Sequence, residues 1–184
     1  MPPEIHALLA SVDPEAVVAL MREVAVQEIL SRFRHLKEGD IAIKSYAQDF
    51  VTKADTEAER VLTERLPLLV PNSLVLGEES VYRDSKVLDL LDSDSLVWVL
   101  DPLDGTRRFK ESIEGFSMLV ALVYQRTPIM GFLLEPDLTA LDSPESQKVY
   151  VAVLGQGLHL NSLKNDPIRV SPCLRAHEEI TASV

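Results

Sequence analysis

The chain has 184 residues, of which 46% are hydrophobic and 26% are charged, as in an ordinary globular protein long enough to bury a core. Its formal net charge of −11 argues against non-specific nucleic-acid binding, which requires a basic face. Cys173 is the only cysteine, which excludes an intrachain disulfide and a cysteine metal cluster and favours a reducing, cytoplasmic location.

The N-terminus predicts neither a secretory signal nor a membrane anchor. It has no basic region followed by an apolar run, and no apolar stretch of the chain is long enough to span a bilayer. We therefore expect no membrane partner. Residues 1–13 predict only a loose lead-in.

Two helices are predicted in the first third of the chain. Asp13 and Pro14 are typical of a helix start, and apolar residues then recur at near-helical spacing until Gly39 ends the helix. A second helix is expected to begin at Asp55, and Pro67 is expected to end or kink it.

Mostly antiparallel strands are predicted after these helices. The expected strands are residues 74–76, 96–101, 116–124, 129–134, 148–154, 158–160 and 168–170, with residues 126–128 as a hairpin turn. The predicted fold class is α+β, with two N-terminal helices packed on a mostly antiparallel sheet. The expected domain covers residues 14–171, and residues 172–184 are predicted to be a frayed tail.

Acidic residues follow two of the predicted strands. Glu78 and Glu79 come after the first, and Asp101 and Asp104 come after the second, in a turn that contains Gly105. If the two strand ends were neighbours, four carboxylates would meet, and they would repel one another without a cation between them. Hard dications such as Mg²⁺ prefer oxygen ligands of this kind. Taken singly, however, an adjacent glutamate pair is usually exposed surface, and two aspartates spaced in this way usually form a turn.

Three further features fit phosphate chemistry at this acidic turn. The Thr106 hydroxyl is placed to orient a water, and Asp55 is placed to orient Thr106. The backbone N–H groups near Gly105 and Thr106 are suited to a phosphate. An aspartate at a helix start is usually only a cap, so Asp55 alone carries little weight.

Three blocks of this sequence together resemble the inositol monophosphatase family of lithium-sensitive, Mg²⁺-dependent phosphatases. They are residues 49–55 (DFVTKAD) with Glu59, residues 77–80 (GEES), and residues 101–106 (DPLDGT) with Phe109. Weaker matches lie at residues 155–161 and 167–171. The last of the three blocks is long and specific, and the resemblance covers roughly residues 14–171.

The resemblance implies a set of metal ligands. Glu78, Asp101 and the Leu103 carbonyl would hold the first metal ion. Asp101 would bridge to a second ion that Asp104 also binds, and Glu79 would support the site.

The resemblance also implies catalytic and substrate-binding residues. Glu78 and Thr106 would activate the attacking water, with Asp55 behind Thr106. Gly105 and Thr106 would contact the phosphate, and Lys44 matches a lysine near the site in some members. The implied function is Mg²⁺-dependent hydrolysis of a small phosphorylated metabolite, with inositol phosphate as the first choice.

Two departures from the family pattern leave alternatives open. Arg107 and Arg108 stand where many inositol phosphatases have an asparagine, which keeps a 3′(2′),5′-bisphosphate nucleotide open as the substrate. Trp98 is the only tryptophan, and no late W-D-x-A block follows residue 171, so we expect the C-terminal α/β half of the family fold to be absent. A second metal ion would then lack a ligand.

Two other functions are therefore kept as alternatives. The chain could be a non-catalytic dimerisation or regulatory module that retains one metal site, and a homodimer is expected in either case. An acidic stretch, residues 84–94, could instead make a calcium-binding surface protein, although it lacks the glycine and the distal glutamate of an EF-hand.

Overall fold

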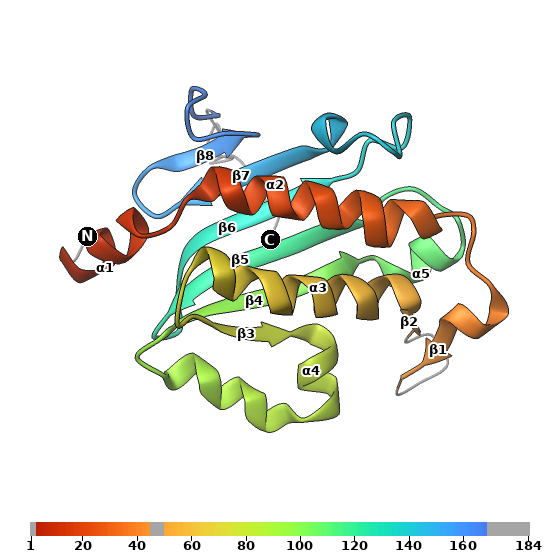
Figure 1. The fold of residues 1–184 in the computed structure, drawn as a ribbon, viewed down its shortest axis with the longest axis horizontal. Helices are drawn as coiled ribbons and strands as arrows, with labels where there is room; N and C mark the ends of the chain where they lie inside the picture. Colours follow the sequence, from red (N-terminus) through yellow and green to blue (C-terminus); the bar gives the residue numbers. More distant parts are fainter. Residues whose placement is uncertain (1–2, 45–49, 169–184) are drawn as a thin grey trace, which may run out of the picture.

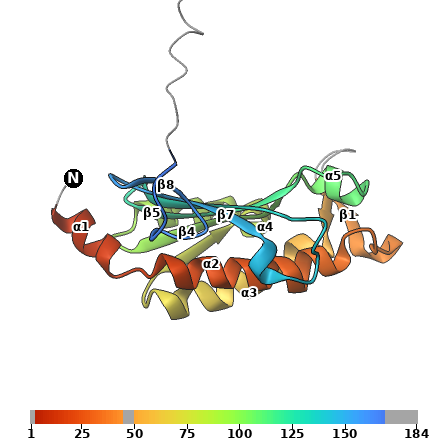
Figure 2. The same ribbon diagram turned by 90° about the horizontal axis from the view of Figure 1, so that it is seen from above.

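The computed structural model describes residues 3–44 and 50–168 of the chain. Two long helices, α2 (Pro14–Val24) and α3 (Lys53–Leu69), lie side by side on one face of a six-stranded sheet. Figure 1 shows both helices crossing the strands, and Figure 2 shows them on the same side of the sheet. The predicted α+β class is therefore confirmed.

The sheet has the strand order β3-β4-β5-β6-β7-β8. Its strands are β3 (Leu74–Gly77), β4 (Leu96–Asp104), β5 (Ser117–Tyr124), β6 (Thr127–Glu135), β7 (Lys148–Val153) and β8 (Gly157–Leu160). Strands β3 and β4 pair in parallel, and the other neighbours pair antiparallel. A separate antiparallel hairpin joins β1 (Ile41–Ile43) and β2 (Phe50–Thr52).

Short helical segments complete the described fold. They are α1 (Pro3–Ala10), η1 (Ala25–Ile29), η2 (Leu30–Arg32), η3 (Glu38–Asp40), α4 (Glu78–Arg83), η4 (Ser85–Asp92), α5 (Thr106–Lys110) and η5 (Pro144–Ser146). Helices α4 and α5 and the β1–β2 hairpin lie at the same end of the sheet, where β3 and β4 finish (Figure 1). None of the helices that the structure describes is long and apolar enough to cross a bilayer.

The first two helices differ from the prediction. Residues 3–10 form a helix rather than a loose lead-in, because the apolar residues Leu9 and Val12 at its end are buried in the core. The helix that starts at Pro14 does not reach Gly39, since its last turns become π-helical and 3₁₀ and end at Arg32.

The start and end of α3 also correct the prediction. The N-cap is Thr52, whose hydroxyl accepts a hydrogen bond from the Ala54 amide, and Asp55 is the third residue of the helix. Asp55 completes a capping box by accepting from the Thr52 amide. Pro67 lies inside the last turn, where its missing amide removes one hydrogen bond near the helix end, and the helix continues to Leu69.

The predicted start of one strand also needs correction. Another predicted strand falls partly outside the described residues. The β5–β6 turn consists of Gln125 and Arg126, both with positive φ, so β6 already begins at Thr127. Ile168 belongs to no strand, although its amide donates to the Leu158 carbonyl. The rest of the predicted strand at 168–170 and the predicted tail at 172–184 lie outside the described residues.

The core lies between the helices and the inner face of the sheet. Phe33 of the segment after α2 packs against Phe109 and Phe116, with ring centroids 5.5 and 5.0 Å away. Trp98 is fully buried, and its indole N–H donates to Ser73. These aromatic contacts fix α5 and the loop after it to the end of the sheet.

Candidate metal and phosphate site

The parallel pairing of β3 and β4 brings the two predicted acidic segments together. Gly77 is in register with Leu100, so Glu78, the first residue of α4, and Asp101 of β4 follow at the same edge of the sheet. Asp104 lies beyond an irregularity in the β4–β5 pairing and is exposed. Below, Glu78, Asp101 and Asp104 are called the Asp101 cluster.

Asp101 carries a poorly compensated carboxyl group. Its Oδ1 atom is buried and has no hydrogen-bond partner among the described residues. Burial, the charge of Glu78 and a hydrogen bond to it, and the charge of Asp104 together raise the pKa of Asp101 to about 7. A cation at this position would relieve the cost of an ionised Asp101.

Both carboxylate oxygens of Asp55, in contrast, are hydrogen-bonded. Asp55 Oδ2 accepts from the Thr52 amide at 2.7 Å and from the Thr52 hydroxyl at 2.5 Å, and its Oδ1 accepts from the Thr106 hydroxyl at 2.9 Å. The Thr106 hydroxyl also lies 3.0 Å from the Leu103 carbonyl oxygen. Burial raises the pKa of Asp55, and these hydrogen bonds oppose the rise. Thr52, Asp55, Thr106 and the Leu103 carbonyl are called the Asp55 network below.

Gly105 connects the two groups and can only be glycine without strain. Its φ of 92° lies in the left-handed region, and a Cβ there would come within 3.2 Å of the Gly115 carbonyl oxygen. The turn therefore directs the chain straight from Asp104 into α5, and Thr106 becomes the first residue of that helix.

Glu59 holds the glutamate segment in place, a role that sequence reasoning did not assign. Its carboxylate accepts hydrogen bonds from the amides of Glu79, at 2.8 Å, and Ser80, at 3.0 Å. A Cβ on Gly77 would lie only 2.2 Å from Glu59 Cδ. The available signal was the spacing of Glu59 four residues after Asp55, which places both on one face of α3.

Lys44 lies between the two glutamates. Its Nζ is 2.7 Å from Glu78 Oε1 and 2.5 Å from Glu79 Oε1, and its side chain is only 4% exposed. Burial lowers the pKa of Lys44, but the hydrogen bonds and charges of the two carboxylates outweigh burial and raise it. Burial raises the pKa of Glu79, and Lys44 opposes that rise.

The chemistry of the predicted ligands fits a hard dication, although their arrangement is not yet a coordination shell. Carboxylates and a backbone carbonyl are oxygen donors, and the buried Asp101 oxygen has no hydrogen-bond partner among the described residues. Within residues 3–44 and 50–168, however, no three His, Cys, Asp or Glu side chains stand close enough to enclose an ion. The structure brings Glu78 to Asp101 but does not bring Asp104 into ligand range with them.

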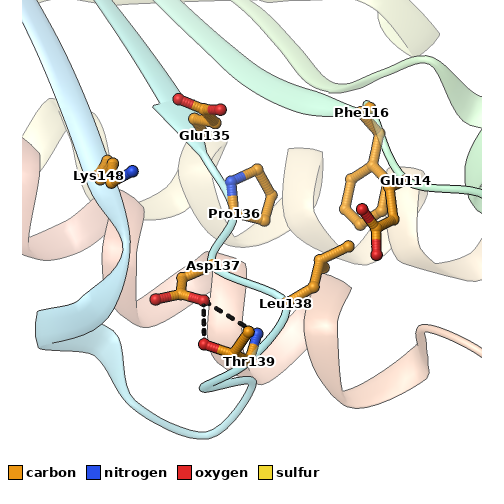
Figure 3. A pocket seen from close by; sticks show the side chains of 9 residues that line it. Glu114, Phe116, Glu135, Pro136, Asp137, Leu138, Thr139 and Lys148 are labelled. Carbon is orange, nitrogen blue, oxygen red and sulfur yellow. Dashed lines mark hydrogen bonds between the residues drawn. The ribbon is translucent and has the colours of Figure 1, made fainter.

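A separate cavity of about 310 Å³ lies beyond the loop that follows α5 (Figure 3). It is lined by Glu114, Gly115, Phe116, Glu135, Pro136, Asp137, Leu138, Thr139 and Lys148. Asp137 is bonded to the amide and hydroxyl of Thr139. None of the predicted site residues lines this cavity. Its three carboxylates against one ammonium make it a poor site for a phosphate.

The sequence model of the inositol monophosphatase family matches residues 11–184. The chain belongs to the inositol monophosphatase family. An inositol-1-monophosphatase of Mycobacterium bovis is 32% identical over 123 residues, which are 67% of this chain and 39% of that protein. The 3′(2′),5′-bisphosphate nucleotidase CysQ of Haemophilus influenzae is 35% identical over 89 residues, which are 48% of this chain and 32% of that protein.

Solved structures of this family share the fold. A Thermotoga maritima IMPase aligns with a TM-score of 0.64 and 23% identity, over 85% of this chain and 53% of that one. An IMPase/NADP phosphatase complexed with Mg²⁺ and phosphate aligns with a TM-score of 0.51 and 22% identity, over 72% of this chain and 44% of that one. The chain thus spans about a third to about half the length of these four proteins.

Of the three family blocks, two are described in full. Residues 77–80 and 101–106 meet at one edge of the sheet; Glu59 anchors the first of these blocks, and Phe109, in the helix after the second, is buried against Phe33 and Phe116. Asp49, which opens the first block, lies outside the described residues. Asn161, in the weaker match, accepts a hydrogen bond from the Val149 amide and so helps to hold the end of the sheet.

Proposed function

We propose that the chain forms the metal- and phosphate-binding part of a Mg²⁺-dependent phosphomonoesterase. The observation that carries the proposal is the partnerless, buried Asp101 oxygen beside Glu78, at the sheet edge that also bears the Asp55 network. Glu78, Asp101 and the Leu103 carbonyl would hold one ion, and Asp101 and Asp104 would hold a second. Bound Mg²⁺ supplies charge to the phosphate oxygens and lowers the pKa of a coordinated water.

The hydrogen bonds of the Asp55 network give Thr106 its role. Because both hydrogen bonds from Thr52 go to Asp55 Oδ2, Oδ1 is left for the Thr106 hydroxyl. Thr106 donates its only proton there, so its oxygen lone pairs can accept a hydrogen bond from a water. Glu78 takes the proton of that water, and the amides of Gly105 and Thr106 bind the phosphate.

The proposed substrate is a small phosphate monoester, with inositol phosphate first. The M. bovis relative supports inositol phosphate, and the CysQ relative supports a 3′(2′),5′-bisphosphate nucleotide as the alternative. The proposal includes a homodimer and a cytoplasmic location, the latter supported by the single cysteine.

The test is the release of inorganic phosphate from inositol 1-phosphate and from adenosine 3′,5′-bisphosphate, each with Mg²⁺ and with EDTA. We expect release only with Mg²⁺, and loss of release in Asp101→Asn. Absence of release from both substrates by protein with a cooperative melting transition would refute catalysis by this chain.

One observation favours a second candidate, a non-catalytic dimerisation module. The face of the sheet opposite α2 and α3 forms an apolar hollow that includes Val99, Leu119, Ala121, Leu133 and Leu158. A face of this kind promotes association when nothing covers it. Light scattering separates the two candidates, because a strictly monomeric chain that releases phosphate contradicts the module.

A further inference from the structure

We infer that Lys44 is an internal counter-cation that holds Glu78 and Glu79 in the absence of metal and competes with a dication for Glu78. The first part of this inference stands on the geometry of Lys44 alone. The competition rests on the proposed function, because it requires Glu78 to be a metal ligand.

Lys44 is a buried positive charge that is paired with two carboxylates. Its ammonium lies within 2.7 Å of a carboxylate oxygen of each glutamate, and almost none of its side chain is exposed. It also lies 5.8 Å from the centroid of the Tyr82 ring. An unpaired ammonium in such surroundings would be strongly destabilising, so the two carboxylates are needed to keep it there.

The two glutamates differ in a way that divides the roles of Lys44. The side chain of Glu79 is 8% exposed, whereas that of Glu78 is 44% exposed and contacts Asp101. Glu79 therefore depends on Lys44 for its charge compensation. Glu78 has two neighbours, because it contacts both the Lys44 ammonium and the Asp101 carboxyl group.

Competition follows from the charges. A dication bound by Glu78 and Asp101 would take up the carboxylate that Lys44 now holds, and it would be repelled by the ammonium beside it. Lys44 thus stabilises the metal-free protein and weakens metal binding at the same time. Removing its charge should reverse both effects.

The first experiment measures melting in EDTA. Lys44→Met keeps an apolar side chain of similar length and should lower Tm, because Glu79 then loses its partner. Adding Glu79→Gln to this variant should recover part of the loss, since position 79 then carries no unpaired buried charge. An unchanged Tm in Lys44→Met, or no recovery in the double variant, would refute the counter-cation role.

The second experiment measures Tm as a function of Mg²⁺ concentration. We expect the Mg²⁺ concentration for half-maximal stabilisation to fall about three- to tenfold in Lys44→Met, which by the equilibrium relation corresponds to about 0.7–1.4 kcal/mol. Lys53→Met is the matched control, because Lys53 is exposed on α3 and its loss changes the net charge equally.

The outcomes separate this inference from the proposed function. An equal shift in both variants, or no shift in Lys44→Met, would refute competition while leaving the phosphatase proposal intact. If the wild-type protein shows no response to Mg²⁺, both the competition and the metal step of the proposed function are refuted. The melting experiment in EDTA then still decides whether Lys44 is the counter-cation.

Discussion

The Asp55 network and the Asp101 cluster lie at the same end of the molecule, but they differ in whether the oxygens of their central carboxyl group have hydrogen-bond partners. Both oxygens of Asp55 are bonded to named donors, whereas Asp101 keeps a buried oxygen without a partner in the described structure. The first is complete without a ligand. In the second, Lys44 compensates Glu78, but the buried Asp101 oxygen has no partner among the described residues, so a cation beside Asp101 would stabilise it.

This difference separates the parts of the site that position other groups from the parts that bind. Protein hydrogen bonds fix the Thr106 hydroxyl before any ligand is present, so no further entropy is lost in orienting it when a ligand binds. The Glu78 carboxylate lies near Asp101, and the repulsion between the two groups makes ionisation of Asp101 less favourable in the folded protein. Four substitutions test this contrast.

The largest expected effect is the loss of Asp55. Asp55→Ala leaves the buried Thr52 amide and hydroxyl without their acceptor and leaves the Thr106 hydroxyl only the Leu103 carbonyl, and should reduce the free energy of unfolding by about 2–4 kcal/mol. Urea denaturation measures the change. Asp40→Ala is the control, because Asp40 also caps an amide, that of Lys37, but in an exposed bond. Equal losses in the two variants would contradict the idea of a buried positioning network.

The close approach of Gly77 to Glu59 gives the next effect. Gly77→Ala pushes a methyl group against the Glu59 carboxylate, which two amides hold in place, and should cost about 1–3 kcal/mol of unfolding free energy. Gly39→Ala is the control, since nothing lies within 4 Å of its added Cβ. A Gly77→Ala protein as stable as the control would mean that Glu59 can move freely.

A smaller loss is expected at Thr106. Thr106→Val removes the hydroxyl that Asp55 Oδ1 accepts, and should lower the free energy of unfolding by about 1 kcal/mol. Thr106→Ser keeps the hydroxyl and should lose less in urea denaturation. If Ser and Val variants are equally destabilised, the methyl group rather than the hydrogen bond is what the fold needs.

The last effect should have the opposite sign. Because the pKa of Asp101 is raised to about 7 from an ordinary value of 3.8, the folded protein retains this proton more readily than the unfolded chain. Ionisation of Asp101 therefore costs no stability below about pH 4 and costs progressively more up to about pH 7, above which the penalty is constant. In EDTA, Asp101→Asn should match the wild type at about pH 4 and melt higher at about pH 8.

Mg²⁺ should abolish this advantage of Asp101→Asn, because only the wild-type carboxylate gains from the ion. Tm measured with and without Mg²⁺ at about pH 8 gives the comparison. A variant that melts below the wild type in EDTA would show that Asp101 is well compensated and would remove the contrast with Asp55.

The acidic turn could be read from the sequence because its determinants are local. The buried strand that runs into residues 101–106 fixes where Asp101 and Gly105 lie. In the same way, the strand pattern before Glu78 fixes where Glu78 lies. Pairing two such strand ends needed one assumption, and the parallel register of β3 and β4 satisfies it.

The remaining parts of the site depend on contacts between distant segments. Lys44 and Glu78 belong to different elements, and nothing near Lys44 in the sequence indicates which carboxylate it meets. The position of Asp104 relative to Glu78 and Asp101 depends on an irregularity in the β4–β5 pairing, which involves a strand further along the chain. Residues 1–13 were expected to be a loose lead-in, whereas the helix there is ordered by burial of Leu9 and of Val12 just after it.

The parallel pairing of β3 with β4 also bears on how the site tolerates change. Parallel neighbours need a crossover connection, here α4 and η4, which runs away from the sheet edge and returns at Leu96. The entropy of closing such a loop grows only slowly, by about 0.6 kcal/mol for each doubling of its length. The entropy of chain closure therefore places little limit on the length of this crossover, and the bonds of Asp92 to Arg126 and of Asp94 to Gln125 are what tie its end to the β5–β6 turn.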